Sequence, residues 1–393
     1  LTVDTKFSGL LIFPVLLGWH GVIYFFPPGN AKFPVASKPG KKPKPATKLR
    51  DRGALIPLLV MVAFTIFLIN VQYGFKGSFI SIKSYDEWNR STRGMPTSGM
   101  MKTLAAIPLL SRTPVPLPVS YIQGLDRTVF ADRDEQHPNW YMGAFYPKGE
   151  RFLGYFPSAM ALKTPIPFLF LILLWVGALG YLIKKAPDRI EPHLFLLIPC
   201  AVFFLFYGII CKSQLGLRLI LPIFPFLFCA AGLFLASMES FGAPFFKKYS
   251  KFIMAAVGVL CFWQLIASAR IFPHYLSYFN ELAGGPERGI AYFADSNLDW
   301  GQDLKGLKKY MDEKGLDRIH LVYYGPNGKP ELDYYGIRPA DPADDPEVPW
   351  AISATWRYYA DLEPVKSNIP FDFKNRPPDH RIGYSIFIYD KFN

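Results

Sequence analysis

The chain has 393 residues, of which 51% are hydrophobic and 17% aromatic, and its formal net charge is +12. The hydrophobic residues stand in long blocks, which favours membrane spans over a single globular interior. The charge is divided, because residues 1–270 carry a net +17 and residues 271–393 a net −5. The basic residues flank apolar blocks and form no stripe on a polar fold, so this pattern argues against nucleic-acid binding.

Six apolar segments of 18–21 residues are each long enough to cross a bilayer as a helix. We therefore predict a multi-pass α-helical membrane protein with a C-terminal extracytoplasmic α/β domain, residues 271–393. The first segment, "GLLIFPVLLGWHGVIYFF", is too long and too aromatic for the core of a signal peptide. Within the membrane domain, residues 1–270, the predicted spans are 9–26, 54–71, 166–183, 194–211, 217–237 and 252–270.

Lysine and arginine are concentrated in three loops, residues 27–53, 184–193 and 238–251. These loops fall on one side when the six spans alternate, and basic loops of this kind stay in the cytoplasm. The long loop 71–165 and the domain 271–393 are then expected outside it.

The loop 71–165 contains an apolar stretch, "MMKTLAAIPLLSRTPVPLPVSYI" (100–122), that four prolines interrupt. This stretch is not a straight span, and an interfacial or re-entrant position suits it. An acidic run follows, for which a solvated loop is the expectation and a metal or acid/base site the alternative, although metal-ligand spacing is lacking. The run contains Asp126, Asp132, Asp134, Glu135 and His137.

The four cysteines lie in or beside apolar runs without a CxxC pair, so we interpret them as small hydrophobic residues buried in the membrane. No metal site is predicted from the sequence, and a role for a divalent metal stays open. The cysteines are Cys200, Cys211, Cys229 and Cys261.

After residue 271 the pattern becomes that of a small α/β domain. The stretch "LDWGQDLKGLKKYMDEKG" predicts an amphipathic helix with Leu304, Leu307 and Met311 on one face and Gly315 at its C-terminal end. β-rich runs follow at residues 318–325, 350–356 and 384–390.

Asp299 and Gln302 have the spacing of a capping box, which predicts that the helix begins at Asp299. Asp303 would then lie in the first turn and favour the positive end of the helix by roughly 0.3–1 kcal/mol.

Asp295, Asn297 and Trp300 remain as candidates for contacting a sugar-like ligand or acceptor, because tryptophan suits sugar faces and carboxylates and amides suit hydroxyls. A calcium loop is the alternative, but the glycine and distal glutamate of an EF-hand are missing.

Lys212 and Arg218 bracket a short connection between the fourth and fifth predicted spans. They are either interfacial cations that extend to the membrane surface or a pair that binds the phosphate of a lipid carrier. The sequence has no GxSxG, Walker A or GxGxxG motif, so no nucleotide cofactor is expected.

Four stretches resemble bacterial membrane glycosyltransferases of the GT-C superfamily, in the protein-mannosyltransferase-like and aminoarabinose-transferase-like groups. The longest is "PHYLSYFNELAGGPERGIAYFADSNLDWGQDLKGLKKYM" (273–311). The others are "PLPVSYIQGLD" (116–126), "YFPSAMALKTPIPFLFL" (155–171) and "LGLRLILPIFPFLF" (215–228).

The resemblance implies a bacterial inner-membrane enzyme that transfers a sugar from a polyprenyl-phosphate carrier to an envelope lipid, glycan or protein. It implies that an acid deprotonates the acceptor hydroxyl while cations stabilise the departing phosphate. Arg218 matches an arginine at the outer end of a late helix in the family.

In the family the acid lies in the first outer loop, after the first span. Here only "LTVDTKFSG" precedes the first predicted span, and Asp4 is not in a DD or DE motif. The resemblance therefore implies a C-terminal portion that lacks the catalytic loop. The alternatives are a truncated product, one half of a split gene that works with an N-terminal half or partner subunit, and a member that has lost activity. No catalytic base is predicted.

The alternative from another class is a non-enzymatic membrane component whose outer domain binds glycans or a partner protein. A transporter is a weaker third interpretation, because repeat symmetry is lacking.

Overall fold

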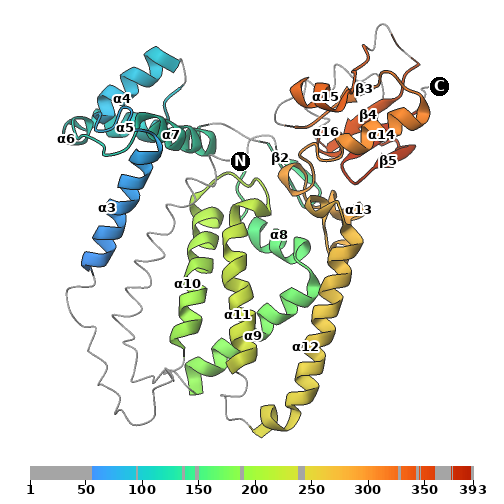
Figure 1. Ribbon diagram of the computed structural model, residues 1–393, viewed down its shortest axis with the longest axis horizontal. Coiled ribbons are helices and arrows are strands. Elements are labelled where there is room, and N and C mark those ends of the chain that lie inside the picture. The colour runs from blue at the N-terminus through green and yellow to red at the C-terminus, as the bar shows by residue number, and fades with distance from the viewer. Residues whose placement is uncertain are drawn as a thin grey trace. The chain divides into compact units, whose positions relative to one another are not determined.

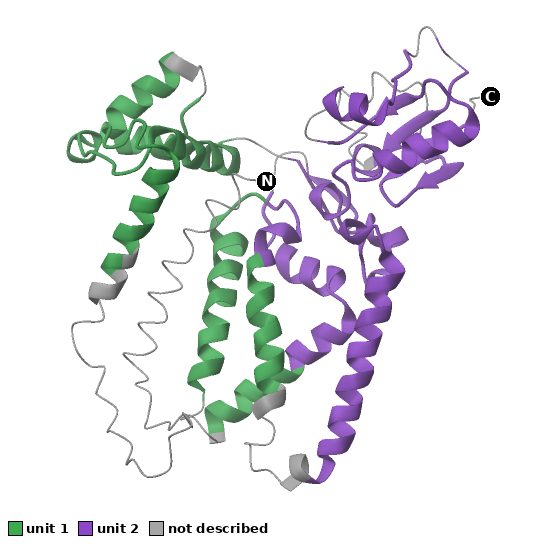
Figure 2. Ribbon diagram, viewed as in Figure 1, with its two compact units in different colours: residues 1–137, 174–213, 222–235 green, residues 138–173, 214–221, 236–393 purple. Residues whose placement is uncertain are grey.

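The chain folds into two compact units in a computed structural model (Figures 1 and 2). Unit 1 comprises residues 1–137, 174–213 and 222–235, and unit 2 comprises residues 138–173, 214–221 and 236–393. Unit 2 thus takes residues from both sides of the predicted boundary at residue 271, which stays a prediction. The structure describes residues 55–93, 96–134, 138–146, 150–185, 190–237, 244–325, 329–341, 345, 347–358, 373 and 375–390. The predicted span 9–26 and the basic loop 27–53 lie outside the described residues.

Among the residues that the structure describes, four helices are long and apolar enough to cross a membrane, and they coincide with the last four predicted spans. They cover Ile166–Lys184, Glu191–Ile210, Leu217–Phe234 and Lys248–Ile271. The second predicted span is also helical, as α3 (Leu55–Gln72), in which Val62–Gln72 is a shorter apolar helix. The elements of the four long segments are α9 (Ile166–Lys185), α10 (Glu191–Leu205), the π-helix η5 (Phe206–Ile210), the 3-10 helix η6 (Leu217–Ile223), α11 (Phe224–Ser237) and α12 (Pro244–Ile271).

The helix α12 leaves large apolar side chains uncovered by the rest of the protein. Phe252 is 75% exposed, and Val259 and Leu265 are each 66% exposed. Exposing such surface to water costs about 25 cal/mol per Å², whereas hydrocarbon accepts it. The helix therefore has the surface of a segment that associates with a membrane.

The proline-interrupted stretch of unit 1 folds as a set of short helices. Helix α5 ends at Ala106 and the next helix begins at Pro108. Ile107 between them is extended, because a proline disfavours a helical conformation in the residue before it. The prediction that this stretch is not a straight span is confirmed, while its interfacial position stays a prediction. The elements of this part are α4 (Ile82–Trp88), the π-helix η3 (Asn89–Arg93), α5 (Gly99–Ala106), α6 (Pro108–Ser111) and α7 (Val119–Arg133).

Unit 2 contains a hairpin of β1 (Asn139–Tyr141) and β2 (Ala144–Tyr146), which is followed by α8 (Tyr155–Lys163). After α12 come four single turns that carry the chain into the C-terminal sheet. They are η8 (Tyr275–Ser277), η9 (Glu281–Ala283), α13 (Pro286–Gly289) and η10 (Asp295–Asn297).

The C-terminal part of unit 2 is a four-stranded mixed sheet of order β3-β4-β6-β5. Strand β3 is parallel to β4, and β6 is antiparallel to both β4 and β5. The α/β character predicted for this region is confirmed, and all three predicted β-rich runs contain strands. The elements are α14 (Leu304–Lys314), β3 (His320–Val322), α15 (Lys329–Tyr335), β4 (Trp350–Ser353), α16 (Ala354–Tyr358), β5 (His380–Ile382) and β6 (Ile386–Tyr389).

The helix α14 packs its predicted apolar face against this sheet. Leu304, Leu307 and Met311 are buried together with Ile386 and Ile388 of β6. The helix ends at Gly315, whose left-handed conformation (φ +66°) suits glycine. The predicted face and C-terminal end of the helix are therefore confirmed.

The predicted capping box at the other end of this helix is wrong. The helix begins at Leu304, and the left-handed backbone of Gly301 (φ +73°) prevents it from beginning at Asp299. Asp299 accepts hydrogen bonds from the backbone N–H groups of Gly301 (3.1 Å) and Thr355 (3.4 Å), so its carboxylate binds its own turn and the first turn of α16. The Gln302 amide oxygen accepts from the N–H of Trp300 at 2.8 Å.

Candidate functional site

The candidate site lies in unit 2, where the loop that carries residues 295–303 meets the residues that open the predicted fifth span. Asn297 joins these segments. Its Oδ1 accepts from the N–H of Leu217 (3.1 Å), and its Nδ2 donates to the Tyr155 hydroxyl (2.9 Å), which also accepts from the N–H of Gly216 (3.0 Å). Asn297 is 1% exposed, so we interpret it as a residue that positions the loop and does not touch a ligand directly.

Arg218 and Trp300, both predicted as binding residues, lie together. The guanidinium carbon of Arg218 is 5.0 Å from the centroid of the Trp300 ring, which is a cation–π distance. The Arg218 Nε donates to the carbonyl of Leu215 at 3.1 Å, which fixes the near end of the guanidinium. Both side chains are half-buried, and this arrangement presents a cation and an aromatic ring at the start of an apolar helix.

Asp295 is held in a conformation that only a few non-glycine residues adopt. Its φ is +56°, in the left-handed region, where a non-glycine residue costs about 1–3 kcal/mol. Its Oδ1 accepts from the Ser296 hydroxyl at 2.7 Å, and its N–H donates to the hydroxyl of Thr355 at 3.2 Å. Strain of this kind gathers at functional sites, and a ligand-binding role for Asp295 stays a prediction.

Tyr324 connects Asp295 to Trp300. Its hydroxyl lies near the charge of Asp295, and its ring centroid is 5.8 Å from that of Trp300. Burial and the nearby charge of Asp295 raise the pKa of Tyr324 well above its usual value, while Arg218 opposes this shift. The tyrosine therefore stays protonated beside the carboxylate.

Lys163, at the C-terminal end of α8, binds backbone carbonyls of the segment 276–297. Its ammonium group donates to the carbonyls of Leu276 and Tyr278 (3.0 Å each) and of Asn297, and it lies 4.1 Å from the centroid of the Phe279 ring. The residue is half-buried as a whole, but these groups enclose its charged end. Burial lowers the pKa of Lys163 to about 7. The lysine thus ties the loop backbone to α8.

Asp303 anchors the far end of the loop. Its Oδ2 accepts from the N–H groups of Tyr384 (3.2 Å) and Ser385 (3.1 Å) and from the Ser385 hydroxyl (2.8 Å). Its Oδ1 is 2.9 Å from the Nδ1 of His274, which follows α12. Asp303 is therefore a buried junction residue and no first-turn aspartate.

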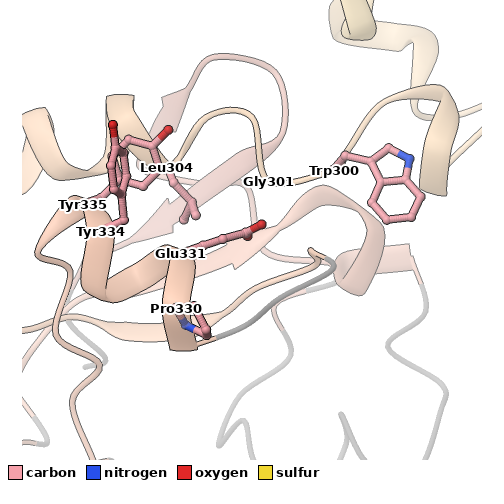
Figure 3. Close-up of a pocket in the computed structure, with 7 residues that line it drawn as sticks. All are labelled: Trp300, Gly301, Leu304, Pro330, Glu331, Tyr334 and Tyr335. Atoms are coloured by element: carbon pink, nitrogen blue, oxygen red, sulfur yellow. The ribbon is translucent and has the colours of Figure 1, made fainter. Parts of the chain in front are cut away.

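A pocket of about 270 Å³ opens beside Trp300 (Figure 3). Tyr334 and Tyr335 of α15 lie at one end and Trp300 at the other, with Glu331 between them. Gly301 and Leu304 complete this side of the wall. The pocket gathers aromatic rings and one carboxylate within the C-terminal sheet region.

Lys212 belongs to unit 1, whereas Arg218 belongs to unit 2. The Lys212 side chain is exposed, and its backbone N–H donates to Asp132 at 2.8 Å. The same carboxylate oxygen accepts from the N–H of Ser213 at 2.7 Å, so Asp132 fixes the connection after η5. A phosphate-binding role for Lys212 stays a prediction.

The other acids of the run 126–137 are also tied to protein groups where the structure describes them. Asp126 is buried and accepts from the hydroxyl of Tyr85 at 2.8 Å and from the N–H of Ser98 at 3.1 Å. The Asp134 carboxylate accepts from the N–H of Gly99 at 3.0 Å. Glu135 and His137 lie outside the described residues.

Sequence reasoning missed Lys163, Tyr324 and Glu331 as members of this region. Lys163 stands directly before an apolar span, where a lysine has the pattern of an interfacial cation, so no sequence signal distinguished it. Tyr324 lies in a β-rich run, in which tyrosine is common. No protein-family model, curated protein or solved structure matches this chain. The site is therefore interpreted from its own chemistry.

Proposed function

We propose that the chain is a GT-C-type glycosyltransferase component that transfers a sugar from a polyprenyl-phosphate carrier to an envelope acceptor. The observation that carries the proposal is the stacking of Arg218 on Trp300 at the start of an apolar helix. A guanidinium there suits a lipid phosphate, and an indole ring suits the sugar attached to it. The family resemblance of the four stretches supports the same assignment.

In the proposed reaction the acceptor hydroxyl oxygen forms a bond to the anomeric carbon of the sugar. The bond from that carbon to the phosphate oxygen breaks, and the carrier leaves as polyprenyl phosphate. Arg218 stabilises the negative charge that the phosphate gains, and the hydroxyl proton passes to a base that we do not assign. Asp295 and Trp300 hold the sugar through its hydroxyl groups and its ring face.

We further propose that these events take place at the outer face of a bacterial inner membrane, crossed by six spans. The basic residues Lys184, Lys185 and Lys248 beside the apolar helices support this orientation. A cysteine that replaces the exposed Lys309 of α14, in a chain without its native cysteines, is expected to react with a membrane-impermeant maleimide in intact cells. Labelling only after lysis would show that α14 lies on the cytoplasmic side, opposite to the proposed orientation.

The test of transfer uses inner-membrane vesicles from cells that make the full chain together with any N-terminal half or partner subunit, a radioactive hexose on polyprenyl phosphate, and an envelope extract as the source of acceptor. Arg218→Ala is expected to lower the rate about 10²–10³-fold, which is typical for loss of one group that stabilises a developing anion. Arg338→Ala, at an exposed arginine of the same unit, is the matched control. Unchanged transfer in a folded Arg218→Ala variant would remove Arg218 from the mechanism.

The second candidate function is a non-enzymatic membrane component that binds glycans. The aromatic pocket beside α15 favours it, because such a pocket needs no reaction to be useful. Absence of transfer from every polyprenyl-phosphate sugar, together with binding of free glycans, would select this function.

A further inference from the structure

The pocket between α14 and α15 has the composition of a site for a small polar ring. Its volume of about 270 Å³ is close to the lower end of the roughly 300–1,000 Å³ of small-molecule pockets. It is also open, so a single ring of a longer chain can enter it while the rest stays in solvent. Figure 3 shows the Glu331 side chain extending from α15 toward the loop segment that contains Gly301.

The aromatic wall offers ring faces to a ligand. Tyr334 is 82% exposed, and its ring packs edge-on against that of Tyr335, with 5.0 Å between the centroids. Trp300 forms the opposite end. The faces of such rings carry partial negative charge and attract the weakly positive C–H groups of a sugar ring.

The carboxylate of Glu331 offers the polar half of the recognition. It accepts a hydrogen bond from the hydroxyl of Tyr323, which orients it. A carboxylate has about four acceptor positions, so Glu331 can also accept from ligand hydroxyls. Glycine at position 301 leaves room for the Tyr323 hydroxyl that orients Glu331, because a Cβ there would lie 2.0 Å from the hydroxyl oxygen.

We propose that this pocket binds one neutral sugar ring of a glycan acceptor, stacked on Tyr334 and hydrogen-bonded to Glu331. The proposal deepens the proposed function and, as an acceptor assignment, rests on it. It selects a glycan over a lipid or a protein as the acceptor. Trp300 then lies between the acceptor pocket and Arg218, which brings the two substrates to the same residue.

The experiment titrates the full chain in detergent with maltose, mannobiose and diacetylchitobiose. Saturation-transfer NMR measures contact with the sugar ring, and tryptophan fluorescence gives the dissociation constant. Tyr334→Ala and Glu331→Gln are each expected to weaken binding about tenfold. The high exposure of Tyr334 means that its replacement leaves the fold intact. Tyr275→Ala, at another exposed tyrosine of unit 2, is the matched control and is expected to bind normally.

The proposal is overturned if no sugar binds to the wild-type chain, or if Tyr334→Ala and Glu331→Gln bind as the wild type does. Failure of the proposed function gives a different result. In that case no variant transfers sugar, but free glycans still bind and still require Tyr334. If transfer takes place, Tyr334→Ala should raise the KM for a glycan acceptor about tenfold and leave the KM for the lipid-linked donor unchanged. An unchanged acceptor KM in Tyr334→Ala would contradict the pocket assignment while the transferase assignment stands.

Discussion

Replacing Asp303 with alanine removes the carboxylate that joins α14 to the turn before β6. Asp303 is 4% exposed and Ser385 is fully buried. The substitution leaves the Ser385 N–H and hydroxyl, and the N–H of Tyr384, without this acceptor. It also removes the partner of His274.

The expected loss follows from the two Ser385 groups alone. A buried donor left without a partner costs about 1–3 kcal/mol, so two such groups predict a loss of about 2–6 kcal/mol. A first-turn aspartate that only favours the helix dipole would contribute roughly 0.3–1 kcal/mol. The two interpretations of Asp303 therefore predict losses that do not overlap.

The assay is hydrogen exchange of the strand amides in the detergent-solubilised full chain, because it reports the free energy of opening of a chosen region. Amides of β4 and β6 should lose about 2–6 kcal/mol of protection in Asp303→Ala. Asp312→Asn is the control on the same helix, since its side chain is 61% exposed and pairs only with Lys308 across one turn. The control should change the opening free energy by less than about 0.5 kcal/mol.

A loss below about 1 kcal/mol in Asp303→Ala would refute this reasoning, because it would match a helix-dipole effect alone. A loss of protection confined to the first turn of α14, with unchanged protection in β6, would also contradict the role of Asp303 in joining α14 to the turn before β6.

Lys163→Met leaves three carbonyls without their donor and should lower the thermal midpoint. The pKa of Lys163 is about 7 in the folded chain and 10.5 ordinarily, so the unfolded chain binds more protons between these pH values. In thermal scans the wild type should therefore gain stability relative to the variant as the pH rises from 7 to 10.5. For Asp299, burial raises the pKa to about 7 from 3.8, so the folded chain binds more protons between these values. Stability of the wild type relative to Asp299→Asn should therefore fall as the pH rises from 4 to 7, and a constant difference would show that the carboxylate titrates normally. Gly301→Ala forces a Cβ against Tyr323 at a positive φ and should lower the thermal midpoint, whereas alanine at the unobstructed helical Gly258 should not.

Local patterns predicted the parts of the fold that local physics determines. The face of Leu304, Leu307 and Met311 follows from helical periodicity, and Gly315 from the left-handed conformation that ends a helix. The last four apolar spans follow from length and composition. Strand β5 was not predicted, because "HRI" has three residues and no apolar alternation.

The remaining errors come from partners far away in the sequence. Asp299 has the spacing of a cap, but Thr355, 56 residues later, binds its carboxylate. Asp303 likewise accepts a hydrogen bond from Ser385, 82 residues later. Lys163 finds its acceptors more than 100 residues away. Short-range spacing cannot reveal such contacts, although it placed Arg218 and Trp300 in the set of candidates that the fold brings together.

Trp300 has two sets of neighbours, since the Arg218 guanidinium lies over its ring and the residue also lines the pocket beside α15. A molecule that changes the position of the indole from one side therefore alters the binding free energy available on the other. Thermodynamic linkage makes this coupling equal in both directions. If an anion at Arg218 tightens sugar binding in the pocket by some factor, a sugar in the pocket must tighten anion binding by that same factor. If both proposed sites exist, Trp300 alone could therefore couple them without any movement of the sheet.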